Sequence, residues 1–401
     1  MSPTLAALAP TSVANTLHHW IEQAVLLGAS DIHFESGADH LRIRYRIDGC
    51  LHIMSQQGIH MRDALMSRLK VLARLDIAEK RLPQDGRIQY PLADGEVDLR
   101  VSSVPTVHGE KLVIRVLDHS RTQPSLQALG YEPDDEHLLR QALQQPHGMV
   151  LMTGPTGSGK TVSLYSCLQL LNRPEVNIST VEDPCEMHLP GINQLNLNER
   201  AGLNFATALR ALLRQDPDIL MVGEIRDEET AAIAIQAAQT GHLVLSTLHT
   251  NSAPATLLRL RHMGVSPFSV AASVLLVVAQ RLLRQLCAHC KQALPSTQQE
   301  TFVASLSAQD KQRIPAHVWQ HPSLHQAVGC AHCLQGYKGR VGVYEMMPIE
   351  SRLQQLMLDN APLPALAQCN QQLGQRNLRQ AGLVKALQGI TSLQEVMLHT
   401  A

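Results

Sequence analysis

The segment Gly154-Pro-Thr-Gly-Ser-Gly-Lys-Thr161 constrains the fold of this chain more than any other feature of its sequence. It matches the pattern G-x-x-x-x-G-K-[ST] at every fixed position. An apolar run at 149–152 precedes it and a helical pattern at 162–171 follows it. Glycines let such a loop curl until its N–H groups point at phosphate oxygens, and the following helix presents its positive end to the same anion. The segment therefore predicts a phosphate-binding loop, because a chance glycine loop leaves both flanking elements unexplained.

This loop predicts that the chain binds ATP and Mg²⁺. Lys160 is expected to bridge the β- and γ-phosphates, and the hydroxyl of Thr161 is expected to hold Mg²⁺. The residues expected to contact the nucleotide are Gly154, Pro155, Thr156, Gly157, Ser158, Gly159, Lys160 and Thr161.

A second motif is acidic and follows an apolar run at 219–222 that predicts a buried strand. Glu224 stands at the carboxyl end of this strand, which is the edge where an open α/β sheet binds ligands. A carboxylate there can orient a water molecule or join the Mg²⁺ shell. Gly223 stands where the second motif of P-loop ATPases usually has Asp, so a purely structural role for Glu224 is the alternative.

Two further patches lie at the ends of predicted strands. Glu182 and Asp183 follow one apolar run and are candidates for metal or water contact, although acids before a proline also suit a turn. His242 precedes another apolar run and His249 follows it. A histidine near a γ-phosphate could sense the state of the nucleotide, and a satisfied structural histidine is the alternative for either residue.

The whole chain predicts two domains joined by a linker, since 401 residues are too many for one ordinary core. We expect a small α+β domain at 11–118, a turn-rich linker at 119–135 and an α/β domain at 136–401. The first domain has helical patterns at 11–28 and near 61–77. Its expected strands are 41–47, 51–54, 86–90, 96–101 and 111–116, with Asp48-Gly49 as a hairpin turn.

The second domain is expected to hold a parallel sheet covered on both faces, because continuous apolar runs alternate with helical patterns. The runs lie at 149–152, 178–181, 219–222 and 243–246. The apolar run at 268–279 is too short to cross a bilayer and is interpreted as a buried helix. Short helices are expected at 350–401. Residues 1–16 lack the pattern of a secretory signal, so we expect a cytoplasmic protein.

Four of the eight cysteines form two matched pairs, Cys287-Ala-His-Cys290 and Cys330-Ala-His-Cys333. In a cytosolic protein such pairs indicate a metal site rather than disulfides. Four thiolates suit tetrahedral Zn²⁺ and leave no position for water, so a structural zinc element is expected within 284–340. Four unrelated reduced thiols are the alternative.

Composition argues against a nucleic-acid motor. The formal net charge is -1 and aromatic residues make up 3% of the chain. The chain therefore has neither a global basic field nor many platforms on which bases could stack. A local channel of Arg42, Arg44 and Arg46 is the alternative left open.

In this order, the four patches at 154–161, 179–186, 218–227 and 240–251 resemble the signature boxes of the ATPases of type II secretion and type IV pilus systems. The resemblance covers nearly the whole chain. It is strongest to the assembly and secretion branch often called PilB or GspE, and within that branch to HofB-type proteins. Further segments that carry it are Ala29-Ser-Asp-Ile-His-Phe-Glu35, Arg81-Leu-Pro-Gln-Asp-Gly-Arg87 and Gly223-Glu-Ile-Arg-Asp227.

The resemblance implies a RecA-like P-loop domain with a tetracysteine zinc insertion, and a smaller PAS-like N-terminal domain. It implies a homohexamer with nucleotide between the two domains, where Arg100 and Arg115 reach the phosphates. A cation there would offset charge that develops during phosphoryl transfer, whereas strand arginines are otherwise usually solvated. The catalytic residues expected on this basis are Lys160, Glu182, Glu224, His249, Arg100 and Arg115.

The resemblance also implies partners. ATP hydrolysis would shift the two domains and turn an inner-membrane platform protein, which extracts pilins or pseudopilins into a fibre, so the protein would lie peripherally at the inner membrane. A tetracysteine element is typical of the assembly branch, and retraction ATPases generally lack it. A retraction ATPase and a nucleotide-binding scaffold with little turnover are the alternatives. The additional N-terminal domain of typical assembly ATPases is expected to be absent, because the motif-bearing domain begins near residue 11.

Overall fold

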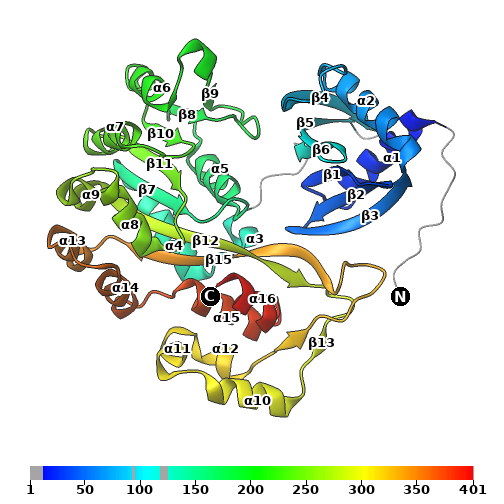
Figure 1. Cartoon of the computed structure of the whole chain (residues 1–401). Helices are drawn as coiled ribbons and strands as arrows, with labels where there is room; N and C mark the ends of the chain where they lie inside the picture. The colour runs from blue at the N-terminus through cyan, green and yellow to red at the C-terminus, as the bar shows by residue number, and fades with distance from the viewer. Residues whose placement is uncertain (1–11, 93–94, 118–124, 401) are drawn as a thin grey trace. The chain divides into compact units, whose positions relative to one another are not determined.

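The computed structural model of this chain describes residues 12–92, 95–117 and 125–400. The chain divides after Thr122 into two compact units, and each is described by itself. Figure 1 labels most of the helices and strands of both units.

The first unit is an antiparallel sheet with two α-helices in its described part. The strands lie in the order β3-β2-β1-β6-β5-β4, and each neighbouring pair is antiparallel. The predicted hairpin turn is confirmed, because Asp48 and Gly49 have φ angles of 50° and 85°, which such a two-residue turn requires. The elements are α1 (Val13–Leu26), β1 (Asp31–Ser36), β2 (His40–Ile47), β3 (Cys50–Gly58), α2 (Arg62–Leu72), β4 (Gln84–Leu92), β5 (Gly95–Thr106) and β6 (Gly109–Leu117).

One strand of this sheet, β1, was not predicted from the sequence pattern. It is central, since it pairs with β2 on one side and with β6 on the other. Its core side carries the fully buried Ile32 and Phe34. Two strongly apolar residues make an alternation too short to indicate a strand by itself.

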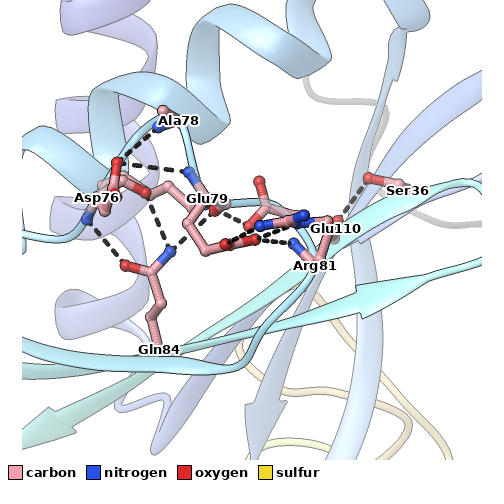
Figure 2. Close-up of polar contacts among 8 residues, drawn as sticks. Ser36, Asp76, Ala78, Glu79, Arg81, Gln84 and Glu110 are labelled. Atoms are coloured by element: carbon pink, nitrogen blue, oxygen red, sulfur yellow. Dashed lines mark hydrogen bonds and ion pairs between the residues drawn. The ribbon is translucent and has the colours of Figure 1, made fainter.

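Polar contacts fix the loop between α2 and β4, which Figure 2 shows. Gln84 donates hydrogen bonds of 3.0 Å to the carbonyl oxygens of Asp76 and Glu79, and its side-chain oxygen accepts a 2.8 Å bond from the N–H of Asp76. Lys70 is 1% exposed, donates a 2.7 Å hydrogen bond to the carbonyl oxygen of Glu79 and forms an ion pair with Glu110. These contacts supply hydrogen-bond partners to main-chain groups of the loop, so they stabilise a single conformation of it.

The second unit is built on a sheet whose described strands lie in the order β15-β12-β7-β11-β10-β8-β9. Neighbouring strands from β12 to β9 are parallel, and β15 is antiparallel to β12, so the sheet is mixed rather than wholly parallel. The α/β architecture is thus confirmed. The strands are β7 (Gly148–Thr153), β8 (Ile178–Glu182), β9 (Asn193–Asn196), β10 (Ile219–Val222), β11 (Leu243–Leu248), β12 (Val274–Leu286) and β15 (Tyr337–Pro348).

Helices cover both faces of this sheet, as β7 illustrates. Met149 and Leu151 pack into one core with residues of α6, α7 and α8, while Val150 and Met152 pack into another with residues of α4 and α5. The helices are α3 (Leu126–Leu129), α4 (Pro133–Leu143), α5 (Lys160–Leu171), α6 (Phe205–Leu212), α7 (Glu228–Gln239), α8 (Ala253–His262), α9 (Pro267–Ser273), α10 (Ser296–Ser305), α11 (Ala308–Arg313), α12 (Ala316–Gln320), α13 (Ser351–Leu358), α14 (Leu363–Gln372), α15 (Leu378–Leu387) and α16 (Leu393–His399).

The predicted buried helix at 268–279 is confirmed only as far as residue 273 and is wrong for 274–279. The helix α9 ends at Ser273, and the long strand β12 begins at Val274. A continuous apolar run suits a buried helix and a fully buried strand equally well, and β12 lies between β7 and β15 in the sheet. The short helices predicted after residue 350 are confirmed as α13 to α16.

The predicted linker at 119–135 lies only partly within the described chain. Residues 118–124 fall outside it, and α3 and the first turn of α4 occupy much of the remainder. Within the described ranges, no helix is both long and apolar enough to span a bilayer.

Candidate active site

Four parallel strands bring the predicted motifs to one edge of the second sheet. The phosphate-binding loop leaves β7 at Thr153, which lies opposite Leu248 at the end of β11. Glu224 follows β10, whose last residue pairs with both β8 and β11. Because these strands are parallel, their carboxyl ends meet at the same edge, and the loop, Glu224 and His249 lie there together.

The loop itself has the conformation that its glycines permit. Gly157 and Gly159 have φ angles of 80° and 87°, in the left-handed region that favours glycine. A Cβ atom on Gly154 would lie 2.5 Å from the carbonyl oxygen of Gln280, so a larger residue does not fit there. The hydroxyl of Ser158 is buried and has no hydrogen-bond partner among the described residues. An unpartnered polar atom in a loop of this shape is consistent with a bound phosphate.

Lys160 begins α5 and points back into the loop. Its Nζ donates hydrogen bonds of 2.8 Å to the carbonyl oxygen of Gly154 and 3.1 Å to that of Pro155. Burial lowers the pKa of Lys160 to about 8, although the charge of Glu224 opposes this shift. A phosphate group would favour the charged ammonium, so this lysine suits an anionic ligand. Thr161 is exposed in the first turn of the same helix, where its hydroxyl can reach a metal ion.

Glu224 is held by two basic side chains at this edge. Arg226 donates a 2.5 Å hydrogen bond to one carboxylate oxygen, and Nε2 of His249 lies 3.3 Å from the other. Arg226 also lies 3.9 Å from a carboxylate oxygen of Asp183. Burial alone would raise the pKa of Glu224, but the hydrogen bond and charge of Arg226, with His249, keep this pKa below its usual value. The carboxylate is therefore ionised at neutral pH and can accept a hydrogen bond from water.

Glu182 lies at the end of β8 but faces protein groups. It is 4% exposed, and its oxygens accept hydrogen bonds from Tyr165, from Thr180 at 2.6 Å and from Gln194 at 3.2 Å. This geometry gives Glu182 a structural contact, and its predicted catalytic role stays a prediction. His242 lies at the opposite end of β11 from His249, with Nδ1 3.1 Å from the carbonyl oxygen of Ala237.

The sequence motifs did not reveal the contribution of β12. Gln280 is 1% exposed and accepts a 2.9 Å hydrogen bond from Ser163 of α5. Arg281 donates to the carbonyl oxygen of Asn251 at 2.9 Å, and its charge contributes to the lowered pKa of Lys160. The apolar run that ends at Ala279 could have revealed these residues. If that run is read as a strand parallel to β7, Gln280 and Arg281 follow it at the same edge as the phosphate-binding loop.

The two arginines predicted to reach phosphates lie in the first unit. Arg100 in β5 is directly opposite Arg115 in β6, and Arg87 in β4 is opposite Arg100. The Nε of Arg115 lies 3.2 Å from the carboxylate of Asp31 in β1, and this arginine side chain is 56% exposed. The strand register thus aligns three arginines in one row across the sheet, of which Arg87 was not predicted.

The four paired cysteines come together although 39 residues separate Cys290 from Cys330. The Sγ atoms of Cys287 and Cys330 are 3.9 Å apart, those of Cys290 and Cys333 3.6 Å, and those of Cys330 and Cys333 3.7 Å. A disulfide would need about 2.05 Å. Four sulfur atoms about 2.3 Å from one tetrahedral Zn²⁺ would lie about 3.8 Å apart, so the donor set and spacing fit zinc.

The cysteine cluster lies where the long strand β12 ends and the long strand β15 begins. Cys287 follows β12 directly, and Cys333 precedes β15 by a short turn. In Figure 1, β12 and β15 run side by side toward β13 (Gln292–Ala293), with α10, α11 and α12 beyond. A metal held by all four thiolates would tie the two strand ends and the segment between them together.

Comparison with known proteins places the chain among secretion and pilus proteins. A sequence model of the family described as type II/IV secretion system protein matches residues 7–398. The type IV pilus assembly ATPase PilB of Acinetobacter baylyi is 49% identical over 374 residues, which cover 93% of this chain and 64% of that PilB. The protein transport protein HofB homolog of Escherichia coli is 46% identical over 385 residues, which cover 96% of this chain and 80% of that protein.

The chain therefore spans less than two thirds of the length of that PilB. Among solved structures, the pilus retraction motor PilT with bound ADP has a TM-score of 0.64 and 25% sequence identity. That match covers 95% of this chain and 96% of the PilT chain.

Proposed function

This chain belongs to the type II/IV secretion system protein family, and we propose that it is a hexameric ATPase that drives assembly of a type IV pilus or pseudopilus. The observation that carries the proposal is the meeting of the phosphate-binding loop, Glu224 and His249 at one sheet edge. The 49% identity to a pilus assembly ATPase, against 25% to the retraction motor PilT, favours assembly over retraction.

In the proposed site, residues 154–161 hold the phosphates of ATP. Lys160 would exchange the carbonyl oxygens of Gly154 and Pro155 for phosphate oxygens, whose charge favours the ammonium form. Thr161 would hold Mg²⁺, which supplies charge neutralisation on the phosphates when it is bound. The chain's own contribution is to position the triphosphate so that its terminal group faces Glu224 and His249.

Glu224 is proposed to orient the attacking water. Its carboxylate is ionised and lies at the same sheet edge as the phosphate-binding loop, and both properties suit a group that orients water beside the phosphates. Arg226 and His249 hold it by hydrogen bonds, and His249 is proposed as the side chain that contacts nucleotide. Arg281 is a further candidate for phosphate contact because its charge already acts on Lys160.

The proposal extends to both units of the chain. The second unit would be a RecA-like domain with a zinc insertion, and the first a PAS-like domain that supplies Arg100 and Arg115 to bound nucleotide. The protein would act as a homohexamer at the cytoplasmic side of the inner membrane, through a platform protein and indirectly on pilins or pseudopilins. It would need no direct contact with nucleic acid.

A count of surface fibres on cells of the source strain tests this proposal against its alternatives. Deletion of the gene is expected to abolish the fibres, and a Glu224→Gln copy is expected to leave them absent because the motor lacks turnover. A Glu229→Gln copy should restore them, since this acid is 57% exposed and pairs with Arg210 on the surface. Excess fibres after deletion would indicate a retraction motor, and full rescue by Glu224→Gln would indicate a scaffold.

A further inference from the structure

Glu345 is a buried acid in the second unit to which the proposed mechanism assigns no role. It lies in β15 opposite Ala279 of β12, and it is 6% exposed. Its Oε2 accepts a 3.0 Å hydrogen bond from the backbone N–H of Ala253, the first residue of α8. Burial raises the pKa of Glu345 to about 7, while that N–H and the charge of Arg281 act in the opposite direction. A carboxyl group in such a place costs stability, so its presence calls for a reason.

The hydrogen bond fixes the far end of a segment that reaches the candidate site. Residues 249–252 connect β11 to α8. Within them, His249 lies 3.3 Å from Glu224, and the hydroxyl of Thr250 lies 2.6 Å from that of Thr153 at the end of β7. The carbonyl oxygen of Asn251 accepts from Arg281. Three contacts with the site thus depend on the position of residues 249–252. Glu345 fixes Ala253, the residue directly after this segment.

Glu345 also interacts with the site electrostatically, through the charge of Arg281. The guanidinium lies on β12, the strand that pairs with β15, and its charge interacts with both Lys160 and Glu345. An ionised Glu345 attracts Arg281, whose hydrogen bond to Asn251 then sets its direction. The acid therefore acts on the site through the backbone of one segment and through the charge of one arginine.

We propose that Glu345 is a positioning residue for ATP hydrolysis, which anchors residues 249–252 and orients Arg281 at the phosphate site. The inference rests on the proposed ATPase function. Glu345 acts on the bound nucleotide only through Ala253 and Arg281. A simple cap on α8 would stabilise the helix without influencing the rate of the chemical step, so kinetics distinguish the two roles.

The test compares two substitutions that remove different properties. Glu345→Gln keeps an oxygen that can accept from Ala253 but removes the charge, and Glu345→Leu removes both. Glu350→Gln is the matched control, because Glu350 is exposed just beyond the end of β15. The measurements are kcat and KM for ATP in the full chain with Mg²⁺, together with thermal unfolding of each variant.

We expect Glu345→Leu to lower kcat on the order of 10-fold or more with little change in KM, because a misplaced group affects the transition state more than binding. Glu345→Gln should recover most of the loss, and Glu350→Gln should match the parent. A folded Glu345→Leu protein with the parent kcat would overturn the inference. If that variant does not fold, Glu345→Asp is used instead, because its side chain is one methylene shorter and moves the carboxylate away from the N–H of Ala253. A lowered kcat in Glu345→Asp would support the positioning role, and an unchanged kcat would refute it.

The pH dependence of stability checks the burial on which the inference depends. A raised pKa means that the folded state binds the proton of Glu345 more tightly than the unfolded state does. The parent should therefore lose stability as pH rises from 4.5 to about 7, and Glu345→Gln should lack this part of the loss. Identical pH profiles would contradict the burial of an ionisable group. A parent without ATP turnover would refute the proposed function itself, and this inference with it.

Discussion

Replacing Glu224 by Gln is expected to lower the rate of ATP hydrolysis by about 100- to 1,000-fold while ATP still binds. The substitution keeps the shape of the side chain and an oxygen that can accept from Arg226. It removes the ionised carboxylate that would orient the attacking water. Since residues 154–161 hold the phosphates, the affinity for nucleotide should change only a few-fold.

Steady-state turnover and equilibrium binding of a fluorescent ATP analogue would be measured on the same preparations. Glu229→Gln is the matched control, since it makes the same chemical change in the first turn of α7, at an exposed ion pair. Turnover within a few-fold of the parent would remove Glu224 from the catalytic role. Loss of binding together with turnover would instead make it a residue for nucleotide binding.

Removing metal from the four-cysteine cluster is the second change with a large expected effect. In small zinc domains, metal binding contributes on the order of 10 kcal/mol to folding. The Sγ spacing of 3.6 to 3.9 Å fits a zinc site, and the cluster closes the ends of β12 and β15. We therefore expect the segment 287–333 to unfold locally once the metal is lost, while the core around β7 keeps its packing.

The purified chain should contain one zinc per molecule by elemental analysis. A Cys290→Ser/Cys333→Ser variant should contain little, and hydrogen exchange should then become fast across 287–333 and stay slow across 148–153. Cys50→Ser is the control because this cysteine lies in the first unit. A metal-free parent whose melting temperature does not respond to a chelator would show that these are four ordinary thiols.

The parts of the site that follow predicted strands were accessible from the sequence. The apolar runs that became β7, β10 and β11 each lead into residues with recognisable chemistry, and parallel pairing places their carboxyl ends together. The structure does bring the phosphate-binding loop, Glu224 and His249 to one edge, while their catalytic roles stay predictions. The resemblance to secretion and pilus ATPases is likewise confirmed by the match over residues 7–398.

Other parts depend on pairing that local patterns do not encode. The start of β12 belongs to the apolar run at 268–279, which predicts a helix because a continuous apolar run has no period that separates helix from strand. The pattern therefore does not place Gln280 and Arg281 at the site. The partners of Glu182 come from α5, β8 and β9, which explains why its burial could not be predicted from its position at a strand end. The anchor between Glu345 and Ala253 joins residues 92 positions apart.

If the edge of the second sheet is a site of ATP hydrolysis, the purified chain should release phosphate from ATP in the presence of Mg²⁺. The comparison is with Lys160→Ala, which removes the ammonium that now binds the carbonyl oxygens of Gly154 and Pro155. We expect measurable turnover in the parent that stops when Mg²⁺ is chelated, and only background turnover in Lys160→Ala. Equal rates in the two proteins would show that this edge of the sheet is not the site of ATP hydrolysis.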